Sequence, residues 1–459
     1  MVIWRTIRKL FFSTYARGFV SSYLLFMVIG AAFLKLPISL QSDQSLSWVD
    51  AFFVSASGLS TTGLSTIVVK DVFSRFGLTV LILIIQVGGI GLIMMVSLFW
   101  LVVRKKITFS ERNMIMTDQN QLSRQGIVRF VRNVLIMILI IEIIGFLVMS
   151  SYFIMFTDYF TTKEAIYQAF FTTISLFTNA GFDIAPGGDS FQMYANDYTI
   201  QSLAMGLMFL GAVGFWPLYE LREWFVHTIK RKPEKYKFTV FTKTLVVLHL
   251  FLWLISTLYI FLAEHNHFLA DKGTLEGVYY SFFMALTTRN AGFSTMDVTQ
   301  FTSATQLVFV VLMFIGSSPN SAGGGIRTTT LLVTLLGIRA FARNRRQVLF
   351  QNRHIKEGTV HKSFIVVLVA IFILVIHLIV LSLVEPYETK LLAFELVSAF
   401  GTTGLSLGIT SELGSVSRVI LIVTMFIGRI GIAALLLMFA PEKRPSGTVK
   451  YPEMDIIIG

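Results

Sequence analysis

The chain has 459 residues, of which 54% are hydrophobic and 14% are charged, and its mean hydropathy is +0.72. Soluble domains carry about 25% charged residues, so this composition excludes a soluble enzyme, a disordered protein and a nucleic-acid-binding protein. It predicts an all-α membrane protein with several spans, and the formal net charge of +12 must lie in the loops. Because the chain has no cysteine, disulfides and thiolate metal sites are also excluded.

Residues 1–18 are basic and contain no small-residue cleavage site, so we interpret them as a retained cytoplasmic lead. Long apolar runs follow, and most of them have enough residues to cross about 30 Å of hydrocarbon. The runs cover residues 19–36, 76–103, 127–156, 199–227, 239–263, 304–315 with a continuation at 326–340, 363–384 and 416–440.

Four shorter apolar stretches lie between alternate runs, and they are too short to span a bilayer. We expect each of them to form a re-entrant helix. They cover Trp48–Gly58, Glu164–Phe177, Leu275–Thr287 and Leu391–Phe400.

Charge alternates along the loops. The segments 104–132, 230–243, 339–362 and 443–450 are rich in Lys and Arg, whereas the intervening loops are mostly acidic. By the positive-inside rule this predicts eight spans with both termini cytoplasmic and the short helices entering from outside. The basic loops either receive an acidic face of a cytoplasmic partner or serve only topology and attraction to lipid.

The strongest pattern is an internal fourfold repeat. Each short stretch ends in a pentad with glycine in fourth place, and successive glycines lie 118, 111 and 112 residues apart. The pentads are Ser60-Thr61-Thr62-Gly63-Leu64, Thr178-Asn179-Ala180-Gly181-Phe182, Arg289-Asn290-Ala291-Gly292-Phe293 and Gly401-Thr402-Thr403-Gly404-Leu405. The predicted repeats are residues 19–106, 107–232, 233–348 with a broken second span, and 349–441, followed by a cytoplasmic tail at 442–459.

Four short loops around one axis can point carbonyl oxygens inward and replace the water shell of a cation. Glycine allows the required backbone angles, and the short helices aim their partly negative C-termini at the ion. We therefore predict one central, K⁺-channel-like pore with the pentads as its filter. The alternative is four tight turns, which four equivalent loops in register disfavour. Arg289 would repel a cation on the axis, so we expect it to point behind the filter toward a carboxylate or carbonyl.

At these residues the chain resembles the superfamily of K⁺ transporters that includes the bacterial TrkH and KtrB pore subunits. The resemblance covers about residues 19–440, and the short lead before the first repeat is more similar to Ktr-type subunits. It implies K⁺ uptake across the bacterial plasma membrane, a homodimer, and a cytoplasmic ring of KtrA-like regulatory subunits. ATP, ADP or NAD would bind to that ring rather than to this chain, no covalent cofactor is implied, and Na⁺ is implied as an activator.

The resemblance also bears on selectivity and on the tail. In related plant proteins a serine at the first filter glycine favours Na⁺, so Gly63 places this chain with the K⁺-selective subclass. The tail Tyr451–Gly459 either docks at the inner face of the dimer or is an ordinary disordered end.

Two features are candidates for a gate. Arg429 lies in the last apolar run, level with small residues in the other repeats, and a mid-bilayer arginine should face a pore or a partner. It is either an electrostatic barrier or a structural arginine paired with a carbonyl or carboxylate. The second candidate interrupts the sixth run and forms either a flexible plug or a simple kink. It comprises Gly316, Ser317, Ser318, Pro319, Asn320, Ser321, Ala322, Gly323, Gly324 and Gly325.

Other residues give weaker signals. The glycines at 323–325 lack the spacing of a phosphate-binding loop, so we reject nucleotide binding there. Glu142, His249 and His377 are either proton relays or, as we favour, members of interhelical hydrogen bonds. The histidines show no metal-binding spacing. The remaining alternatives are a Na⁺-preferring or non-selective channel, a secondary solute carrier and a membrane-embedded enzyme.

Overall fold

The computed structural model describes residues 14–439, apart from 92–93, 96, 98–125, 158–159, 186–189, 232 and 346. Most of the predicted lead, most of the basic loop 104–132 and the whole tail therefore lie outside the described residues. The same holds for the predicted docking of Tyr451–Gly459.

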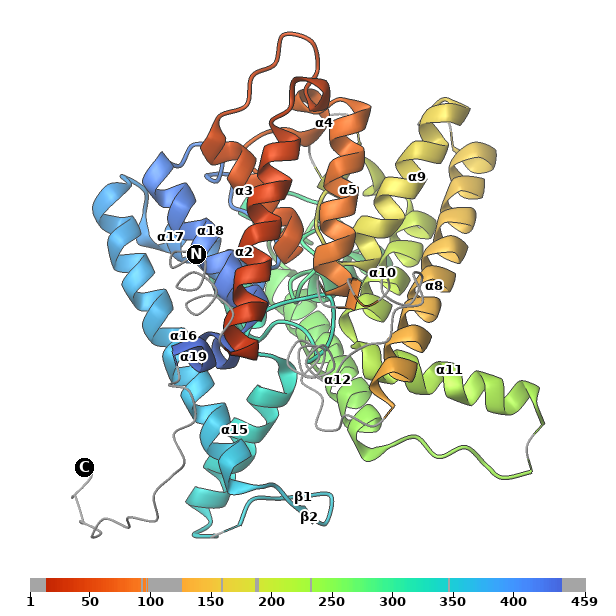
Figure 1. The fold of residues 1–459 in the computed structure, drawn as a ribbon, viewed down its shortest axis with the longest axis vertical. Helices are drawn as coiled ribbons and strands as arrows, with labels where there is room; N and C mark the ends of the chain where they lie inside the picture. The colour runs from red at the N-terminus through yellow and green to blue at the C-terminus, as the bar shows by residue number, and fades with distance from the viewer. Residues whose placement is uncertain are drawn as a thin grey trace, which may run out of the picture.

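Each repeat contains a long first helix, a short helix that ends at a glycine loop, and a second helix that returns through the bundle (Figure 1). The first helices are α2 (Tyr15–Leu34), α8 (Ile127–Phe156), α12 (Val240–Glu264) and α16 (Glu357–Val384). The short helices are α3 (Trp48–Ser60), α9 (Thr162–Phe177), α13 (Thr274–Thr287) and α17 (Thr389–Gly401). The second helices are α5 (Arg75–Ile90), α10 (Tyr198–Ala212), α14 (Ser303–Ile315) and α18 (Ser415–Ile430).

The four first helices are long and apolar enough to cross a bilayer, whereas the second helices have only 13 to 16 residues. At 1.5 Å per residue such helices reach about 20–24 Å. Two of them continue after a sharp corner into α11 (Phe215–Ile229) and α19 (Ile432–Phe439), whose axes turn by 103° and 96°. The runs predicted at 199–227 and 416–440 are therefore bent pairs rather than straight spans.

Glycine explains these corners. The sequence predicted a break only in the third repeat, but all four second helices end next to a glycine with positive φ. These glycines are Gly91 (φ 99°), Gly214 (105°), Gly316 (69°) and Gly431 (86°). Because glycine lacks a Cβ atom, it adopts these angles without the steric cost that other residues meet. A glycine with positive φ at the end of the second helix is thus common to all four repeats, although the sequence predicted a break in the third repeat alone.

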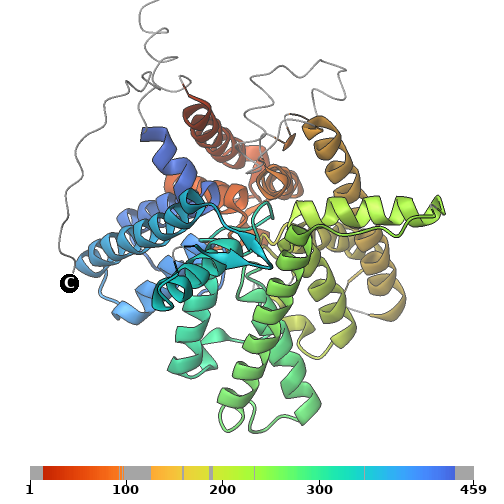
Figure 2. The ribbon, with the colours of Figure 1, turned by 90° about the horizontal axis from the view of Figure 1, so that it is seen from below.

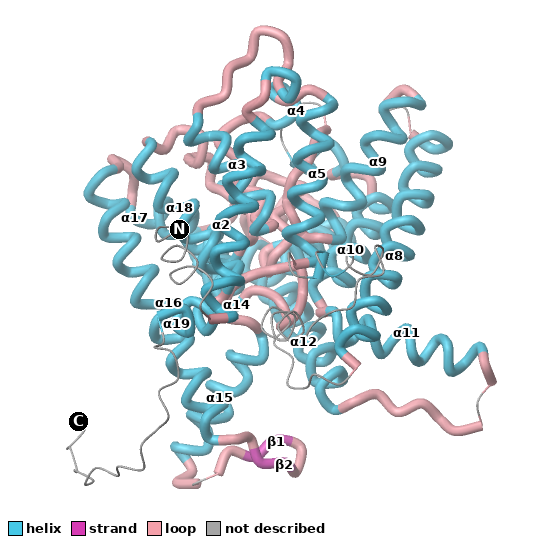
Figure 3. Tube along the Cα trace, viewed as in Figure 1, coloured by secondary structure: helices cyan, strands magenta, loops and turns pink. Residues whose placement is uncertain are grey.

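The repeats follow one another around a common centre, as the colour sequence in Figure 2 shows. The second helix of each repeat packs against the short helix of the next, in the pairs α5 with α9, α10 with α13 and α14 with α17. The ring is closed by α18, which packs against α3 of the first repeat. The glycine loops lie in the middle of this ring, where Figure 3 shows loop rather than helix.

The remaining elements lie mainly at one end of the bundle, at the bottom of Figure 1. They are α11, α15 (Thr328–Ala342), α19 and a hairpin of β1 (Leu349–Phe350) with β2 (Arg353–His354). Because the described parts of the predicted basic loops gather there, we call it the basic end. At the opposite end lie α4 (Val69–Val72) and the 3₁₀ turns Pro37–Ser39, Ser190–Tyr194 and Val298–Gln300.

Candidate functional site

The structure brings the four pentads together in a closed ring. A Cβ atom added to Gly63 would lie 2.7 Å from the carbonyl oxygen of Ala180 in the second repeat. Equivalent approaches join Gly181 to Ala291 (3.1 Å), Gly292 to Thr403 (2.1 Å) and Gly404 to Thr62 (2.1 Å). In each case the oxygen belongs to the residue before the next filter glycine. The four loops therefore meet in cyclic order, and the fourth loop contacts the first.

The pentads hold a strained backbone. All four filter glycines have φ between 71° and 94°, where only glycine is comfortable. Thr61 and Thr402 adopt left-handed angles of 55° and 49°, which is a genuine outlier for a β-branched residue. Such strain persists only where the surrounding structure over-determines it, and it concentrates at functional sites.

Hydroxyl groups of the short helices hold the loops in place. The backbone N–H groups of Gly63 and Gly404 each donate to a serine one turn and a half earlier, Ser57 and Ser398, at 3.1 Å. In the second repeat Ser175 donates to the carbonyl of Phe182 at 2.6 Å. The third repeat uses Thr287, which donates to the carbonyl of Phe293 at 2.6 Å. These small polar residues fix each loop relative to its own helix.

The interrupted segment 316–325 lies directly against the filter pentads. Thr61 Oγ1 donates to the carbonyl of Ala322 at 2.6 Å. The N–H of Gly324 donates to Thr402 Oγ1 at 2.7 Å and to Asn290 Oδ1 at 3.3 Å. Three of the four repeats thus bind this segment through the second residue of their pentads. The sequence predicted a flexible segment here, but gave no sign of these partners.

The second repeat binds the same segment through the corner between α10 and α11. The N–H groups of Ser318 and Ala322 donate to the carbonyls of Ala212 and Gly211, each at 3.3 Å. The N–H of Phe215 donates to the carbonyl of Asn320 at 2.6 Å. Segment 316–325 therefore has partners in all four repeats.

Arg429 is buried beneath the filter, with 8% of its surface exposed. Its guanidinium donates to the carbonyls of Ala322 and Gly88, and to Thr61 Oγ1 at 3.3 Å. It also reaches the carbonyl of Gly89 at 3.2 Å. One side chain thus links segment 316–325 to the end of α5 and to the first pentad. These carbonyl contacts are the ones that a structural arginine would make, and they also place its charge under the filter.

Two further arginines contact the segment. Arg289 is fully buried and donates to the carbonyls of His249 and Gly316, each at 3.2 Å, so it pairs with carbonyls as expected. Arg327 was not identified as a site residue from the sequence. It has a positive φ of 77° and donates to the carbonyl of Gly323 and to Ser317 Oγ at 3.4 Å.

Glu142, His249 and His377 all make interhelical contacts. Glu142 accepts two hydrogen bonds from Gln86, at 2.8 and 2.9 Å. His249 Nδ1 lies 2.9 Å from Arg289, and His377 Nδ1 lies 2.8 Å from Thr424 Oγ1. Hydrogen bonds of this kind are what we favoured from the sequence, as the alternative to proton relays. Among the described residues there is no cluster of His, Asp or Glu that could hold a metal ion.

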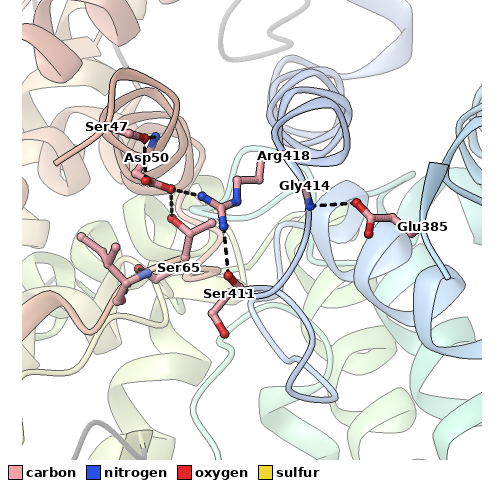
Figure 4. A network of polar contacts seen from close by, with 9 residues as sticks. Ser47, Asp50, Ser65, Glu385, Ser411, Gly414 and Arg418 are labelled. Carbon is pink, nitrogen blue, oxygen red and sulfur yellow. Dashed lines mark hydrogen bonds and ion pairs between the residues drawn. The ribbon is translucent and has the colours of Figure 1, made fainter. Parts of the chain in front are cut away.

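At the opposite end from the basic loops, an ion pair joins the first and fourth repeats. Arg418 of α18 donates to Asp50 Oδ1 of α3 at 2.6 Å and to the carbonyl of Ser411 at 2.9 Å (Figure 4). Asp50 also accepts from Thr66 at 2.7 Å, just beyond the first filter loop. The sequence separates Asp50 from Arg418 by 368 residues and gives no sign of this pair.

A cavity of about 590 Å³ lies on the basic-end side of segment 316–325. Its walls include Tyr23 and Asn320, the arginines Arg327 and Arg429, and Phe350 of the β hairpin. Segment 316–325 therefore separates this cavity from the ring of pentads. The filter ring, the segment and the cavity form one continuous series along the centre of the bundle.

Comparison with known proteins places this geometry in context. Residues 15–449 match a family model described as TrkH, cation transport protein. The chain is 37% identical over 437 residues to the Ktr system potassium uptake protein D of Bacillus subtilis, with 95% of both chains covered. It is 32% identical to the Ktr system potassium uptake protein B of the same organism, again over 95% of both chains. The crystal structure of the potassium transporter TrkH from Vibrio parahaemolyticus has a similar fold, with a TM-score of 0.71, 20% identity, and 93% of this chain and 85% of that chain covered.

Proposed function

Because this chain belongs to the TrkH family of cation transport proteins, we propose that it is the membrane subunit of a Ktr-type potassium uptake system. K⁺ would pass through a single pore at the centre of the four repeats. Transport would run down the membrane potential, which is worth about 2.3 kcal/mol per charge per 100 mV.

The observation that carries this proposal is the closed ring of filter glycines. In this ring the carbonyls of Thr62, Ala180, Ala291 and Thr403 occupy equivalent positions, one per repeat. Four carbonyls around one axis offer a cation the oxygens that it loses with its water shell. The C-termini of α3, α9, α13 and α17 point to the loops and add partial negative charge. The glycine at all four positions supports a preference for K⁺.

We further propose that segment 316–325 and Arg429 form the gate. The segment lies between the filter and the basic-end cavity, so ions could pass only after it moves. Arg429 binds its carbonyl at Ala322 and adds a positive charge under the filter. The hydrogen bonds to all four repeats would hold the gate closed until a signal arrives.

The same proposal includes topology and partners. The positive-inside rule places the basic end in the cytoplasm of a bacterium, with the filter near the outer face. A homodimer and a cytoplasmic ring of nucleotide-binding subunits would complete the system; the word system in the relatives' names supports the presence of further components. Na⁺ would act as an activator rather than as the main transported ion.

Ion flux tests the proposal directly. The purified chain in liposomes should take up ⁸⁶Rb⁺, a K⁺ analogue, in response to an inside-negative potential, and much faster than ²²Na⁺. Expression should also rescue a strain that lacks K⁺ uptake, more strongly with a regulatory subunit present. Equal Na⁺ and Rb⁺ uptake would favour the non-selective channel. Uptake against the potential, coupled to a second ion, would favour a secondary carrier.

A further inference from the structure

The helix α11 and the segment that follows it form a hairpin that leaves the bundle sideways (Figure 1). The axis of α11 turns by 103° from that of α10, so α11 runs roughly perpendicular to α10 and extends outward from the bundle. The return segment, residues 230–231 and 233–239, packs along α11 through aromatic contacts of Trp224 with Phe238 and of His227 with Tyr236. The N–H of Thr239 donates to Glu220 Oε2 at 2.9 Å. We call residues 215–239 the lateral hairpin.

The lateral hairpin has an apolar face that no other described residue covers. With 100° between successive residues, Glu220, Trp224 and His227 share the side that the return segment covers. Phe225 and Ile229 lie 140° to 180° away from Glu220 and are 60% and 68% exposed. In Figure 1 the return segment runs on the side of α11 that faces away from the bundle. The exposed apolar side chains therefore lie on the side of α11 that faces the membrane-spanning part of the bundle.

The height of α11 fits the edge of a bilayer. Trp216 and Tyr219 pack against Phe130 in the first turn of α8, with ring centroids 5.3 and 5.4 Å apart. That helix has 30 residues, about 45 Å, and so exceeds the hydrocarbon thickness of about 30 Å. Its first turns also carry Arg129 and Arg132, which belong outside the hydrocarbon. The lateral hairpin thus lies where headgroups would be.

The charges of the lateral hairpin favour anionic headgroups. Its exposed cations are Lys230, Arg231, Lys235 and Lys237. Its acids are fewer: Glu220 is buried and accepts hydrogen bonds, Glu223 pairs with Arg222 at 2.9 Å, and only Glu234 is exposed. An apolar face beside a cluster of cations is the pattern of an interfacial amphipathic helix. We propose that the lateral hairpin docks onto anionic phospholipids of the cytoplasmic leaflet.

Docking would act on segment 316–325. The corner at Gly214 that begins α11 is hydrogen-bonded to Ser318, Asn320 and Ala322 of that segment. A lipid that fixes α11 therefore also fixes the corner that holds the proposed gate. This consequence rests on the proposed function, and it predicts that K⁺ flux depends on the anionic lipid content of the membrane.

The depth of the hairpin can be measured in the full chain, because it has no cysteine. Spin labels on Phe225→Cys and Ile229→Cys, in nanodiscs of phosphatidylcholine with phosphatidylglycerol, should collide with O₂ rather than with a polar nickel chelate. A label on Lys235→Cys is the control and should favour the nickel chelate. If the labels at 225 and 229 are as open to nickel as the control, or become protected only when a regulatory protein is added, docking onto lipid is wrong.

The contribution of the four cations to lipid binding can be tested separately. Each cation near an anionic surface should strengthen lipid binding about fivefold. Replacing Lys230, Arg231, Lys235 and Lys237 with Gln should therefore reduce phosphatidylglycerol retention, measured by native mass spectrometry, by at least tenfold. Lys163→Gln with Lys390→Gln, at the opposite end, is the control and should retain it. Equal retention in the two variants would overturn the assignment to anionic lipid.

Measurements of ⁸⁶Rb⁺ flux distinguish coupling of the lateral hairpin to the proposed gate from docking of the hairpin onto lipid. Wild-type ⁸⁶Rb⁺ uptake should differ between liposomes with and without phosphatidylglycerol, and the quadruple variant should lose this difference. An identical lipid response in both proteins would overturn the coupling to the gate. Absence of uptake in every lipid would instead contradict the proposed function, whereas the spin-label result would still decide the docking.

Discussion

The filter ring makes a sharp prediction for Gly404→Ala. A Cβ atom there would lie 2.1 Å from the carbonyl oxygen of Thr62, whereas real Cβ atoms essentially never come within 3.0 Å of a neighbour. That oxygen must therefore move by about 0.9 Å, and in the proposed filter it contacts the ion. The loss of one polar contact to a charged group costs about 1.5–3 kcal/mol. If this loss falls on the transport barrier, ⁸⁶Rb⁺ uptake decreases by about 10- to 100-fold.

The control for this variant lies four residues further along the same loop. Gly408 has φ 93°, nearly the same as the 94° of Gly404, but a Cβ atom there would meet nothing within 4 Å. Gly408→Ala therefore carries the same left-handed strain, about 1–2 kcal/mol, without the contact to Thr62. Both variants should be compared at equal amounts of reconstituted protein. If Gly404→Ala transports within twofold of Gly408→Ala, the carbonyl of Thr62 is not part of the ion path.

Four further changes follow from the same site. Arg429→Gln keeps a hydrogen-bond donor but removes the charge, so single-channel or ⁸⁶Rb⁺ flux should rise severalfold if Arg429 is an electrostatic barrier; unchanged flux would leave it a structural residue. Gly63→Ser should shift the Rb⁺/Na⁺ flux ratio toward Na⁺, and an unaltered ratio would separate this chain from the pattern of the plant relatives. Thr61→Val removes the donor to Ala322, worth about 1 kcal/mol, and should raise the open fraction about fivefold. Thr403→Val is its control, because the Thr403 hydroxyl has no hydrogen-bond partner among the described residues. Deletion of residues 318–321 should raise conductance, and an unaltered conductance would remove the gate assignment.

The short helices could be predicted closely from the sequence. The stretch predicted at Leu275–Thr287 is α13, Thr274–Thr287, and that predicted at Trp48–Gly58 is α3, Trp48–Ser60. Their length was informative because an apolar stretch of this size cannot span a bilayer. The pentads added a fixed end point, since each short helix ends within two residues of the first residue of its pentad.

The corners of the second helices were harder to predict. The apolar run continues through Gly214, and around Gly431 it is interrupted only by Arg429, so hydropathy alone indicates a straight span. The third repeat was recognised as broken because polar residues and Pro319 follow its glycine. Backbone angle, rather than polarity, decides these breaks, and the presence of glycine in the sequence does not specify the angle that it adopts.

The sequence predicted that the pentads meet, but it did not predict the individual side-chain contacts within and between the repeats. Arg327 contributes to segment 316–325 only because its own φ is positive and turns its side chain back to Gly323. The pair of Asp50 with Arg418 depends on ring closure between the first and fourth repeats. Periodicity specifies which face of a helix is buried, but it carries no information about which distant repeat covers that face.

If segment 316–325 is the gate, as proposed, the hydrogen bonds of Ala322 indicate how much free energy a gating signal must supply. Its carbonyl accepts from Thr61 and from the charged Arg429, and its N–H donates to Gly211. Neutral hydrogen bonds contribute about 0.5–1.5 kcal/mol each and one to a charged group about 1.5–3 kcal/mol, so opening at this residue costs about 3–6 kcal/mol. About one molecule in 10² to 10⁴ would then be open at rest. A regulator must bind the open form more tightly by the same factor, and a ligand that binds both forms equally would leave the pore closed at any concentration.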